Sequence, residues 1–321
     1  TCALPILKKK NKALRYNFFV TTASSKFKVV GAAIFFLFLL QQSVAQTNVS
    51  TFKNAKKIST DLFGLFFEDI NYAADGGLYA ELVQNRSFEY SPADNKQWHS
   101  LSFWEYITPG FSYGAINTET NNPVHVNNPH YAVLTIEHVG TIPNNATQQS
   151  LPASVTAGRP GVGLKNPGFA NTITKKGERF NFSMFAKQLS TVPVDVYVSL
   201  QNKKGETLAE NKLTINNKEW SKYTALLTTT AGSDSTQIVI TAVSTGKIAV
   251  DMISLFPENT FKSRPNGLRN DLAQLLADMK PAFIRFPGGC LTHGDGLGNM
   301  YRWKNTIGPL EQRTAQKNIW G

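Results

Sequence analysis

The chain has 321 residues, enough for two or three domains, and its 41% hydrophobic and 17% charged residues fit a folded protein rather than a disordered one. Its net charge of +11 is concentrated at the start, because residues 1–60 hold ten Lys and Arg side chains and no Asp or Glu. The other 261 residues hold 23 basic and 22 acidic side chains, and this near-neutral body argues against a nucleic-acid-binding protein.

The first recognisable segment is a leader. Lys26 and Lys28 precede an apolar run over residues 29–40, and small residues follow at 43–45. This order is typical of a secretory signal peptide of bacterial type, cleaved after Ala45, so residues 1–45 are predicted to be a leader. The run is well short of the roughly twenty residues that span a bilayer. We therefore expect an exported protein (periplasmic, cell-surface or secreted) without a stable membrane anchor.

Residues 60–70 form an apolar run that ends in Glu68 and Asp69, which predicts a buried strand with acids at its carboxyl end. Two glycines follow Asp75, and the pattern of residues 78–84 predicts a short helix. A strand that ends in polar groups and leads into a helix is how a barrel enzyme presents a pocket. Residues 46–89 are therefore assigned to the first strand and helix of a barrel.

Residues 90–256 have a different pattern, in which apolar and polar side chains alternate over 180–184 and 194–200. This period of two, repeated in several short runs, predicts an antiparallel β-sandwich (jelly roll) inserted into the chain. The segment from Asn202 to Gly205 predicts a hairpin turn. Five aromatic side chains of residues 90–256 are candidates for a carbohydrate platform, although a core position is the better expectation for each one. They are Trp98, Trp104, Phe111, Tyr113 and Tyr131.

From residue 257 onward the helical period returns. Leucines and a methionine at positions 268, 272, 275, 276 and 279 predict a helix with one apolar stripe, which Pro281 ends. Residues 283–286 predict a second buried strand, and two glycines follow it. The fold class expected is multidomain α/β plus all-β. Residues 46–89 and 257–321 begin a (β/α)8 TIM barrel, truncated, and the sandwich interrupts it.

Glu68 and Asp69 are the first candidates for chemistry. By strand alternation their side chains point to opposite sides, so one of them lines a pocket. Glu68 is our choice, because a carboxylate at a strand end is well placed to hydrogen-bond sugar hydroxyls. The alternative is an acid that is solvated or that caps a turn.

The second strand and its loop supply the other candidates. Arg285 is expected to be buried, either in a structural ion pair or in orienting a catalytic carboxylate. Cys290 is expected to fill a pocket wall rather than act as a nucleophile. His293 and Asp295 alone do not make a metal site. Trp303 is either a core residue or a platform on which a sugar stacks.

Several blocks of the sequence resemble the α-L-arabinofuranosidases of glycoside hydrolase family 51. The resemblance covers about Thr60–Gly321, and its inserted sandwich is similar to carbohydrate-binding, galactose-binding-like modules. The blocks are Gly64–Ile70, Asp75–Glu89, Asp251–Pro257, Asn266–Leu272, Arg285–Cys290 and Tyr301–Pro309.

The resemblance implies a (β/α)8 barrel and retaining hydrolysis of terminal α-L-arabinofuranosyl groups from arabinose-containing hemicellulose, with no metal or other cofactor. It implies that Glu68 binds arabinose and that Cys290 lines the sugar subsite, and Trp303 and Arg285 complete the predicted substrate-binding set. The family takes its acid/base from an Asn-Glu pair, and no such dipeptide occurs here. We therefore expect an amino-terminal fragment, inactive alone, whose catalytic glutamates lie beyond Gly321.

Two other hypotheses remain. The first is a non-catalytic carbohydrate-binding protein that acts through the β-sandwich of residues 90–256. The second is a degenerate chain that makes no stable product.

Overall fold

The computed structural model describes residues 56–142, 158–169 and 172–320, so the predicted signal peptide lies outside the described residues. The chain divides into two units, Thr1–Thr60 and Asp61–Gly321. The second unit contains every strand and α-helix named below.

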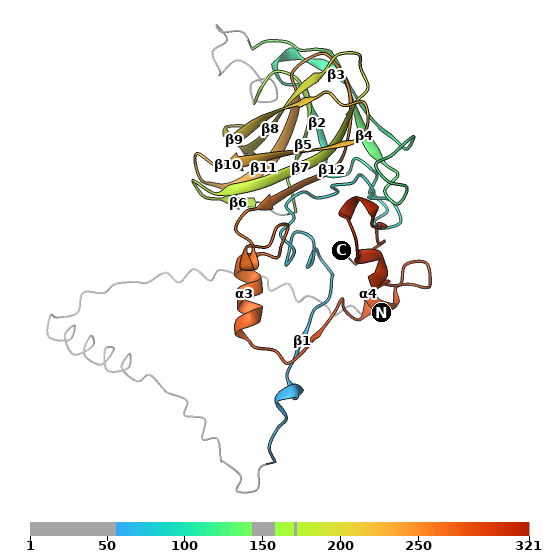
Figure 1. The fold of residues 1–321 in the computed structure, drawn as a ribbon, viewed down its shortest axis with the longest axis vertical. Helices are drawn as coiled ribbons and strands as arrows, with labels where there is room; N and C mark the ends of the chain where they lie inside the picture. Colours follow the sequence, from blue (N-terminus) through green and yellow to red (C-terminus); the bar gives the residue numbers. More distant parts are fainter. Residues whose placement is uncertain (1–55, 143–157, 170–171, 321) are drawn as a thin grey trace, which may run out of the picture. The chain divides into compact units, whose positions relative to one another are not determined.

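Two antiparallel sheets form the larger part of this unit (Figure 1). The first sheet has five strands, which in spatial order are β10 (Ser221–Thr228), β7 (Arg179–Gln188), β12 (Gly246–Pro257), β4 (Tyr131–His138) and β3 (Tyr113–Glu119). The second sheet has five strands in line, with β6 (Thr172–Thr174) pairing separately with β11: β2 (Glu105–Ile107), β5 (Val162–Asn166), β11 (Ser233–Ala242), β8 (Val194–Asn202) and β9 (Thr207–Ile215).

Side chains that alternate along the strands pack between the two sheets. Phe182 and Met184 of β7 are at most 1% exposed, and Val196 and Val198 of β8 are fully buried. All four belong to one hydrophobic cluster. The predicted antiparallel sandwich is confirmed, because the period of two places every second residue on the buried face.

The predicted hairpin turn is also present, since the backbone N–H of Gly205 donates to the carbonyl oxygen of Asn202 at 2.9 Å. This turn joins β8 to β9.

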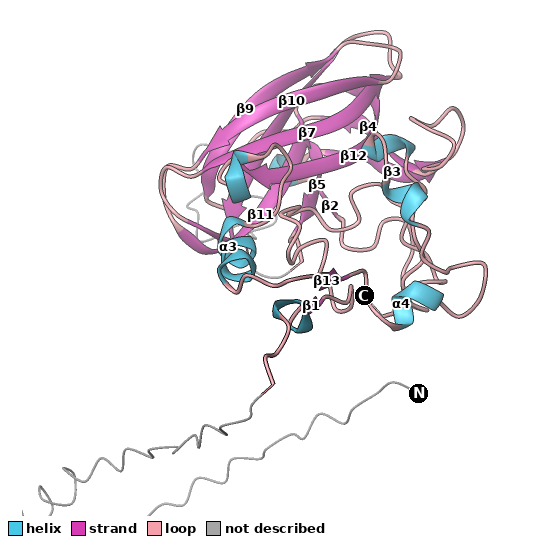
Figure 2. Ribbon diagram, turned by 60° about the horizontal axis from the view of Figure 1, so that its bottom comes forward, coloured by secondary structure: helices cyan, strands magenta, loops and turns pink. Residues whose placement is uncertain are grey.

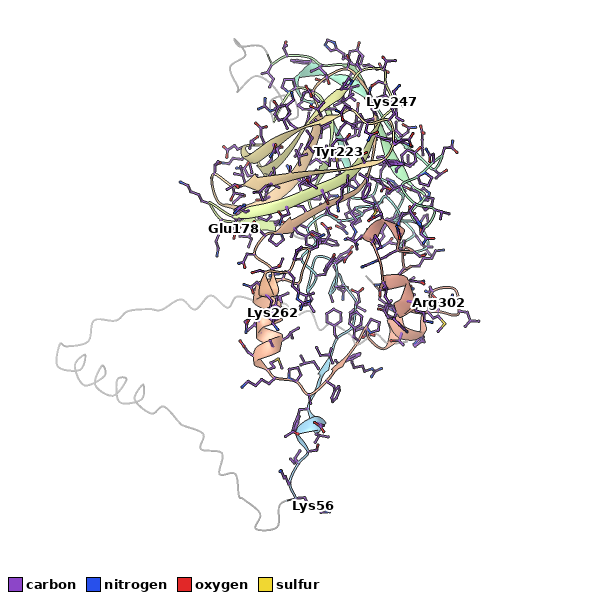
Figure 3. The ribbon with its side chains drawn as sticks, viewed as in Figure 1. Lys56, Glu178, Tyr223, Lys247, Lys262 and Arg302 are labelled. Atoms are coloured by element: carbon purple, nitrogen blue, oxygen red, sulfur yellow. The ribbon has the colours of Figure 1, made fainter. Side chains whose placement is uncertain are left out.

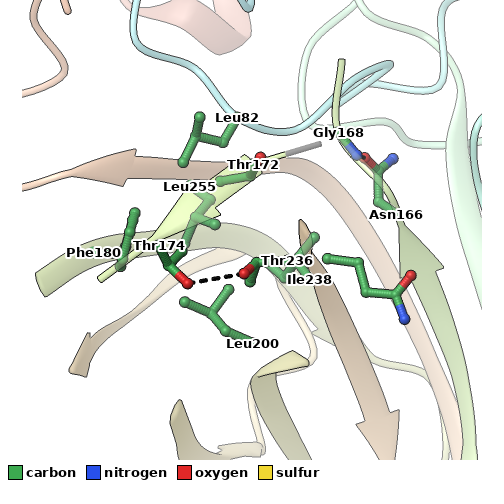
Figure 4. A pocket seen from close by; sticks show the side chains of 11 residues that line it. Leu82, Asn166, Gly168, Thr172, Thr174, Phe180, Leu200, Thr236, Ile238 and Leu255 are labelled. Atoms are coloured by element: carbon green, nitrogen blue, oxygen red, sulfur yellow. Dashed lines mark hydrogen bonds between the residues drawn. The ribbon is translucent and has the colours of Figure 1, made fainter. Parts of the chain in front are cut away.

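A small gap lies inside the sandwich, beside Leu82, Leu200 and Leu255 (Figure 4). Thr174 and Thr236 line it and share a hydrogen bond of 2.9 Å between their hydroxyl groups. Its volume of about 10 Å³ is room for one water molecule at most. This gap is therefore a packing feature and offers no space for a sugar.

The helix predicted over residues 78–84 is wrong. Tyr79 instead forms isolated bridges with Asp75 and Leu268, and the N–H of Leu82 donates to the carbonyl oxygen of Leu255 at 3.0 Å. Val83 is 1% exposed and belongs to the hydrophobic cluster of the sandwich. Burial of this segment outweighs its local helix preference, because a short isolated helix is only marginally stable.

Glu81 anchors that segment although its side chain is fully buried. Its Oε1 accepts the backbone N–H groups of Leu82, Val83 and Leu255 at 2.9–3.0 Å, and its Oε2 accepts Nη1 of Arg86 at 3.2 Å. These partners compensate for removing the carboxylate from water. Burial raises the pKa of Glu81, and the positive charge of Arg86 opposes that rise.

The remaining elements are short (Figure 2). Strand β1 (Leu65–Phe66) pairs in parallel with β13 (Ile284–Arg285). The helices are α3 (Asn270–Asp278) and α4 (Cys290–His293). Lys262 lies in η3 (Phe261–Ser263) and Arg302 directly precedes η4 (Trp303–Thr306), and both residues are labelled in Figure 3. The 3-10 turns are η1 (Thr60–Leu62), η2 (Pro109–Phe111), η3 (Phe261–Ser263), η4 (Trp303–Thr306) and η5 (Leu310–Gln312).

Both predicted buried strands are shorter and more exposed than expected. Ile284 and Phe286 are 56% and 57% exposed. A parallel strand is buried only when other elements cover both of its faces. Within the described residues, β1 and β13 have only each other as strand partners. This parallel pair agrees with neighbouring barrel strands but does not make a barrel, so the barrel stays a prediction.

The predicted helix before that strand is present as α3. Its apolar stripe is largely exposed, because Leu275 and Met279 are each 64% exposed and Ala273 is the buried residue of the helix. The spacing therefore predicted the helix correctly, and the described residues leave most of its apolar face in solvent.

Candidate functional site

Two backbone N–H groups hold the carboxylate of Glu68. Its Oε1 accepts the N–H of Gly289 at 2.7 Å and the N–H of Cys290 at 2.8 Å. The parallel ladder continues past β1, since Asp69 N donates to the carbonyl oxygen of Pro287 at 2.9 Å. That pairing brings Glu68 beside the glycine loop. We call Glu68 and the backbone of residues 288–290 the glutamate cradle.

Gly288 is required at its position in the cradle. Its φ is +145°, a conformation that residues with a side chain rarely adopt. A Cβ added there would lie 2.4 Å from Cγ of Glu68. The loop can therefore close around the carboxylate only because position 288 has no side chain.

Three side chains converge at the next glycine. A Cβ placed on Gly289 would lie 3.3 Å from Oε1 of Glu68, 3.8 Å from Nη2 of Arg285 and 3.9 Å from Cζ of Phe66. The guanidinium carbon of Arg285 lies 4.8 Å from the centre of the Phe66 ring. A carboxylate, a guanidinium group and an aromatic ring thus meet at one edge of the β1–β13 pair.

The expected burial of Arg285 is wrong. Its side chain is exposed, and no ion pair joins it to an acid within residues 56–142, 158–169 and 172–320. Contact with the Phe66 ring takes the place of the predicted ion pair, in line with the tendency of arginine to stack on aromatic faces.

Asp69 points away from the cradle, as alternation requires. Its Oδ1 accepts the N–H of Ala74 at 2.9 Å, and burial raises the pKa of Asp69. Asn318 donates its Nδ2 to the carbonyl oxygen of Asp69 at 3.0 Å. Asp69 therefore organises the turn that follows β1, while Glu68 faces the glycine loop.

Cys290 and Trp303 differ in their relation to this site. Cys290 is half-buried, begins α4 and shares in the cradle through its backbone N–H. Trp303, in η4, is 60% exposed, with Nζ of Lys304 at 5.9 Å from its ring centre. The core alternative for Trp303 is therefore wrong, and its side chain is available to an external ligand.

The five aromatic candidates of the sandwich divide into buried, half-buried and exposed side chains. Trp104 and Tyr131 are buried core residues at 8% and 2% exposure. Trp98 is half-buried and stacks on Tyr90 with ring centres 4.5 Å apart. Phe111 and Tyr113, at 54% and 56%, present their rings to solvent.

The described stretches hold no group of three or more His, Cys, Asp or Glu side chains placed to bind a metal ion. None of the helices in the same stretches is long and apolar enough to cross a bilayer.

Phe66 was not among the residues selected from the sequence. It lies two positions before Glu68, so strand alternation places both side chains on one face, and that period could have found it. The burial of Glu81 had no comparable signal, because it depends on contact with β12 across 174 residues of sequence.

Comparisons with known proteins point to the same family as the sequence blocks described above. The family model of the α-L-arabinofuranosidase 1 domain matches residues 275–321, which contain Gly288, Gly289 and Cys290 of the cradle. An extracellular exo-α-L-arabinofuranosidase of Streptomyces chartreusis is 36% identical over 276 residues, which are 82% of this chain and 29% of the relative. The chain is related to the α-L-arabinofuranosidases of glycoside hydrolase family 51.

Two further comparisons agree with this family. α-L-Arabinofuranosidase 1 of Arabidopsis thaliana is 34% identical over 270 residues, covering 83% of this chain and 37% of that protein. The solved structure of an arabinose-bound family 51 α-L-arabinofuranosidase superposes with a TM-score of 0.68 at 31% identity, covering 83% of this chain and 40% of that one. The chain thus spans 29% to 40% of the length of these family members.

Proposed function

We propose that the glutamate cradle is part of an arabinose-binding subsite in a retaining α-L-arabinofuranosidase that acts on arabinose-containing hemicellulose. The observation that carries this is the state of the Glu68 carboxylate. Both of its backbone hydrogen bonds go to Oε1, and no hydrogen bond to Oε2 is present among the described residues. Oε2 is thus left to accept a hydrogen bond from a sugar hydroxyl.

The neighbours of Glu68 suit a sugar. Phe66 offers an apolar ring face, Arg285 offers N–H donors, and Cys290 begins the helix that follows the cradle. Trp303, whose ring is exposed, is proposed as a further contact on the basis of the sequence. Sugar sites combine a few fixed polar groups with aromatic surface in this way. The relationship to a structure with bound arabinose supports the same ligand.

Glu68 binds rather than cleaves in this proposal. Retaining hydrolysis needs two carboxyl groups about 5–5.5 Å apart, one as nucleophile and one as acid/base. Glu68 is paired with no second carboxylate in the described stretches, and its Oε1 is already held by two backbone N–H groups. We propose that the catalytic pair is not among the residues of this chain, and that β1 and β13 belong to a barrel that the pair completes.

Export is part of the proposal. The leader pattern of residues 29–45 supports it, and the Streptomyces relative is named as extracellular. Outside the cell, arabinose-bearing polysaccharide is accessible to the cradle.

Binding and turnover of the purified chain test this function. Isothermal titration with arabinose is expected to show binding that Glu68→Gln weakens by about tenfold, because a neutral amide replaces the charged acceptor. Asp69→Asn is the matched control, since Asp69 faces away from the cradle, and it should leave binding unchanged. The chain alone should release no p-nitrophenol from an aryl arabinofuranoside, and turnover that Glu68→Gln abolishes would make Glu68 catalytic instead.

A second candidate is a non-catalytic carbohydrate-binding protein that acts through the sandwich. The exposed rings of Phe111 and Tyr113 favour it, because sugars pack on exposed aromatic rings. Gel retardation on arabinoxylan that Tyr113→Ala removes, while Glu68→Gln does not, would support this candidate over the cradle.

A further inference from the structure

A groove of about 420 Å³ lies away from the glutamate cradle, against the outer face of the five-stranded sheet. Phe182 and Met184 of β7 point into the core, so Ser183 and Phe185 point outward and line the groove. Lys222 of β10 lies directly opposite Phe185 across the strand pair. Tyr223, its neighbour in β10, is labelled in Figure 3. The groove has the volume of a small-molecule site.

The opposite wall is the turn of residues 308–313, which the sandwich holds in place. Asn128 is 4% exposed and donates Nδ2 to the carbonyl oxygens of Glu311 and Arg313 at 2.9 and 2.7 Å. Arg313 in turn donates Nε and Nη2 to the carbonyl oxygen of Gly308 at 3.0 and 2.8 Å. The wall is therefore formed before a ligand arrives, which lowers the ordering cost of binding.

The charges that line the groove are unequal. Lys222 and Arg313 are positive, and Glu311 is the one negative side chain in the lining. No carboxylate pairs with Lys222 among the described residues, and its Nζ lies 6.0 Å from the centre of the Phe185 ring. The side-chain N–H groups of Arg313 are partly occupied by the carbonyl oxygen of Gly308, so Lys222 is the cation that is available to a carboxylate.

We propose that this groove binds a uronic-acid-bearing sugar, with the sugar ring on Phe185 and its carboxylate at Lys222. An aromatic ring beside an unpaired cation matches a ligand that has both an apolar face and a carboxylate. Ser183 and Tyr79 add hydroxyl groups to the lining. The groove would thereby hold an acidic branch of a polysaccharide at a place separate from the cradle.

A pair of oligosaccharides tests this binding on the purified chain. One is a xylo-oligosaccharide with a single glucuronic acid branch, and the other is the same compound with that carboxyl group reduced to an alcohol. The acidic compound is expected to bind about tenfold more tightly, because a charge-assisted hydrogen bond is lost on reduction. High salt should shrink the preference, since exposed charges are screened.

Three variants locate the effect. Lys222→Met should abolish the preference, Lys222→Arg should keep it, and Lys203→Met in the β8–β9 turn should leave it unchanged. Lys222 and Lys203 are both exposed, so the fold should tolerate these changes, and thermal melts confirm it. Equal affinity of the unmodified chain for the two compounds, binding of neither, or a preference that survives Lys222→Met would each overturn the proposal. Arabinose binding at Glu68 is measured separately and does not depend on this outcome.

Discussion

The Cγ of Glu68 lies 2.4 Å from the point that a Cβ of residue 288 would occupy, so the side chain at position 68 and the glycine at position 288 depend on each other. The acid lies two residues after β1, and the glycine lies in the loop after β13, the parallel partner strand. The two residues are 220 positions apart in the sequence, and the pairing of β1 with β13 brings them together, so the cradle is a tertiary feature.

Gly288→Ala is expected to open the cradle. The added methyl group meets Glu68 and the residue must hold a φ of +145°, which together cost about 1–3 kcal/mol locally. The N–H groups of Gly289 and Cys290 should then exchange with solvent roughly tenfold or more faster, measured by hydrogen exchange. Gly296→Ala is the control, because nothing lies within 4 Å of its added Cβ. Unchanged exchange in Gly288→Ala would contradict the close approach.

Asp251 should make stability depend on pH. Its side chain is fully buried, and burial raises its pKa well above 3.8, against the lowering effect of the Met252 N–H, while Glu89 raises it further. When folding raises the pKa of a carboxyl group, its contribution to the free energy of unfolding is fully present below the unfolded-state pKa. That contribution is lost as the pH rises through the folded-state pKa.

Asp251→Asn is therefore expected to be more stable than the unmodified chain at neutral pH, because the amide has no ionised form that burial would penalise. The difference should shrink as the pH falls toward 4. Urea unfolding between pH 4 and 8 measures it, with the exposed Asp234→Asn as control. A stability difference independent of pH would show that the carboxyl does not titrate with folding.

The pair of Glu81 and Arg86 should be costly to break. Glu81 has a fully buried side chain, and the Arg86 side chain is 19% exposed. Arg86→Met leaves the buried carboxylate without its cation, which is expected to lower the free energy of unfolding by about 3 kcal/mol. Arg269→Met removes an exposed partner of Asp271 and should cost at most about 1 kcal/mol. Chemical denaturation compares the two, and equal losses would show that burial of Glu81 has no energetic effect.

Limited proteolysis should cut the chain first after the sandwich. Strands β7, β8, β11 and β12 are hydrogen-bonded on both sides and enclose the buried core, whereas Leu275, Ile284 and Phe286 are more than half exposed. Local stability follows burial and hydrogen bonding. Mass spectrometry of early fragments should therefore find cleavage within 262–320 and an intact 179–257. Equal protection of the two ranges would contradict this.

The alternation of Phe180, Phe182 and Met184 and of Val194, Val196 and Val198 was enough to predict strands β7 and β8 and the face that each buries. The same holds for α3, whose leucine spacing is periodic. These elements follow from the sequence because the period of side-chain direction is a property of the local backbone. The glutamate cradle was predicted in part, since Glu68 was selected at the strand end but its backbone partners were not.

Tertiary structure decided the rest. The segment over residues 78–84 packs against β12 because burying Glu81 and Val83 there stabilises it more than a short helix would. Arg285 is exposed on Phe66 because no described element covers β13. Sequence patterns state which side chains share a face, whereas only packing decides what covers that face, since burial depends on residues distant in the chain.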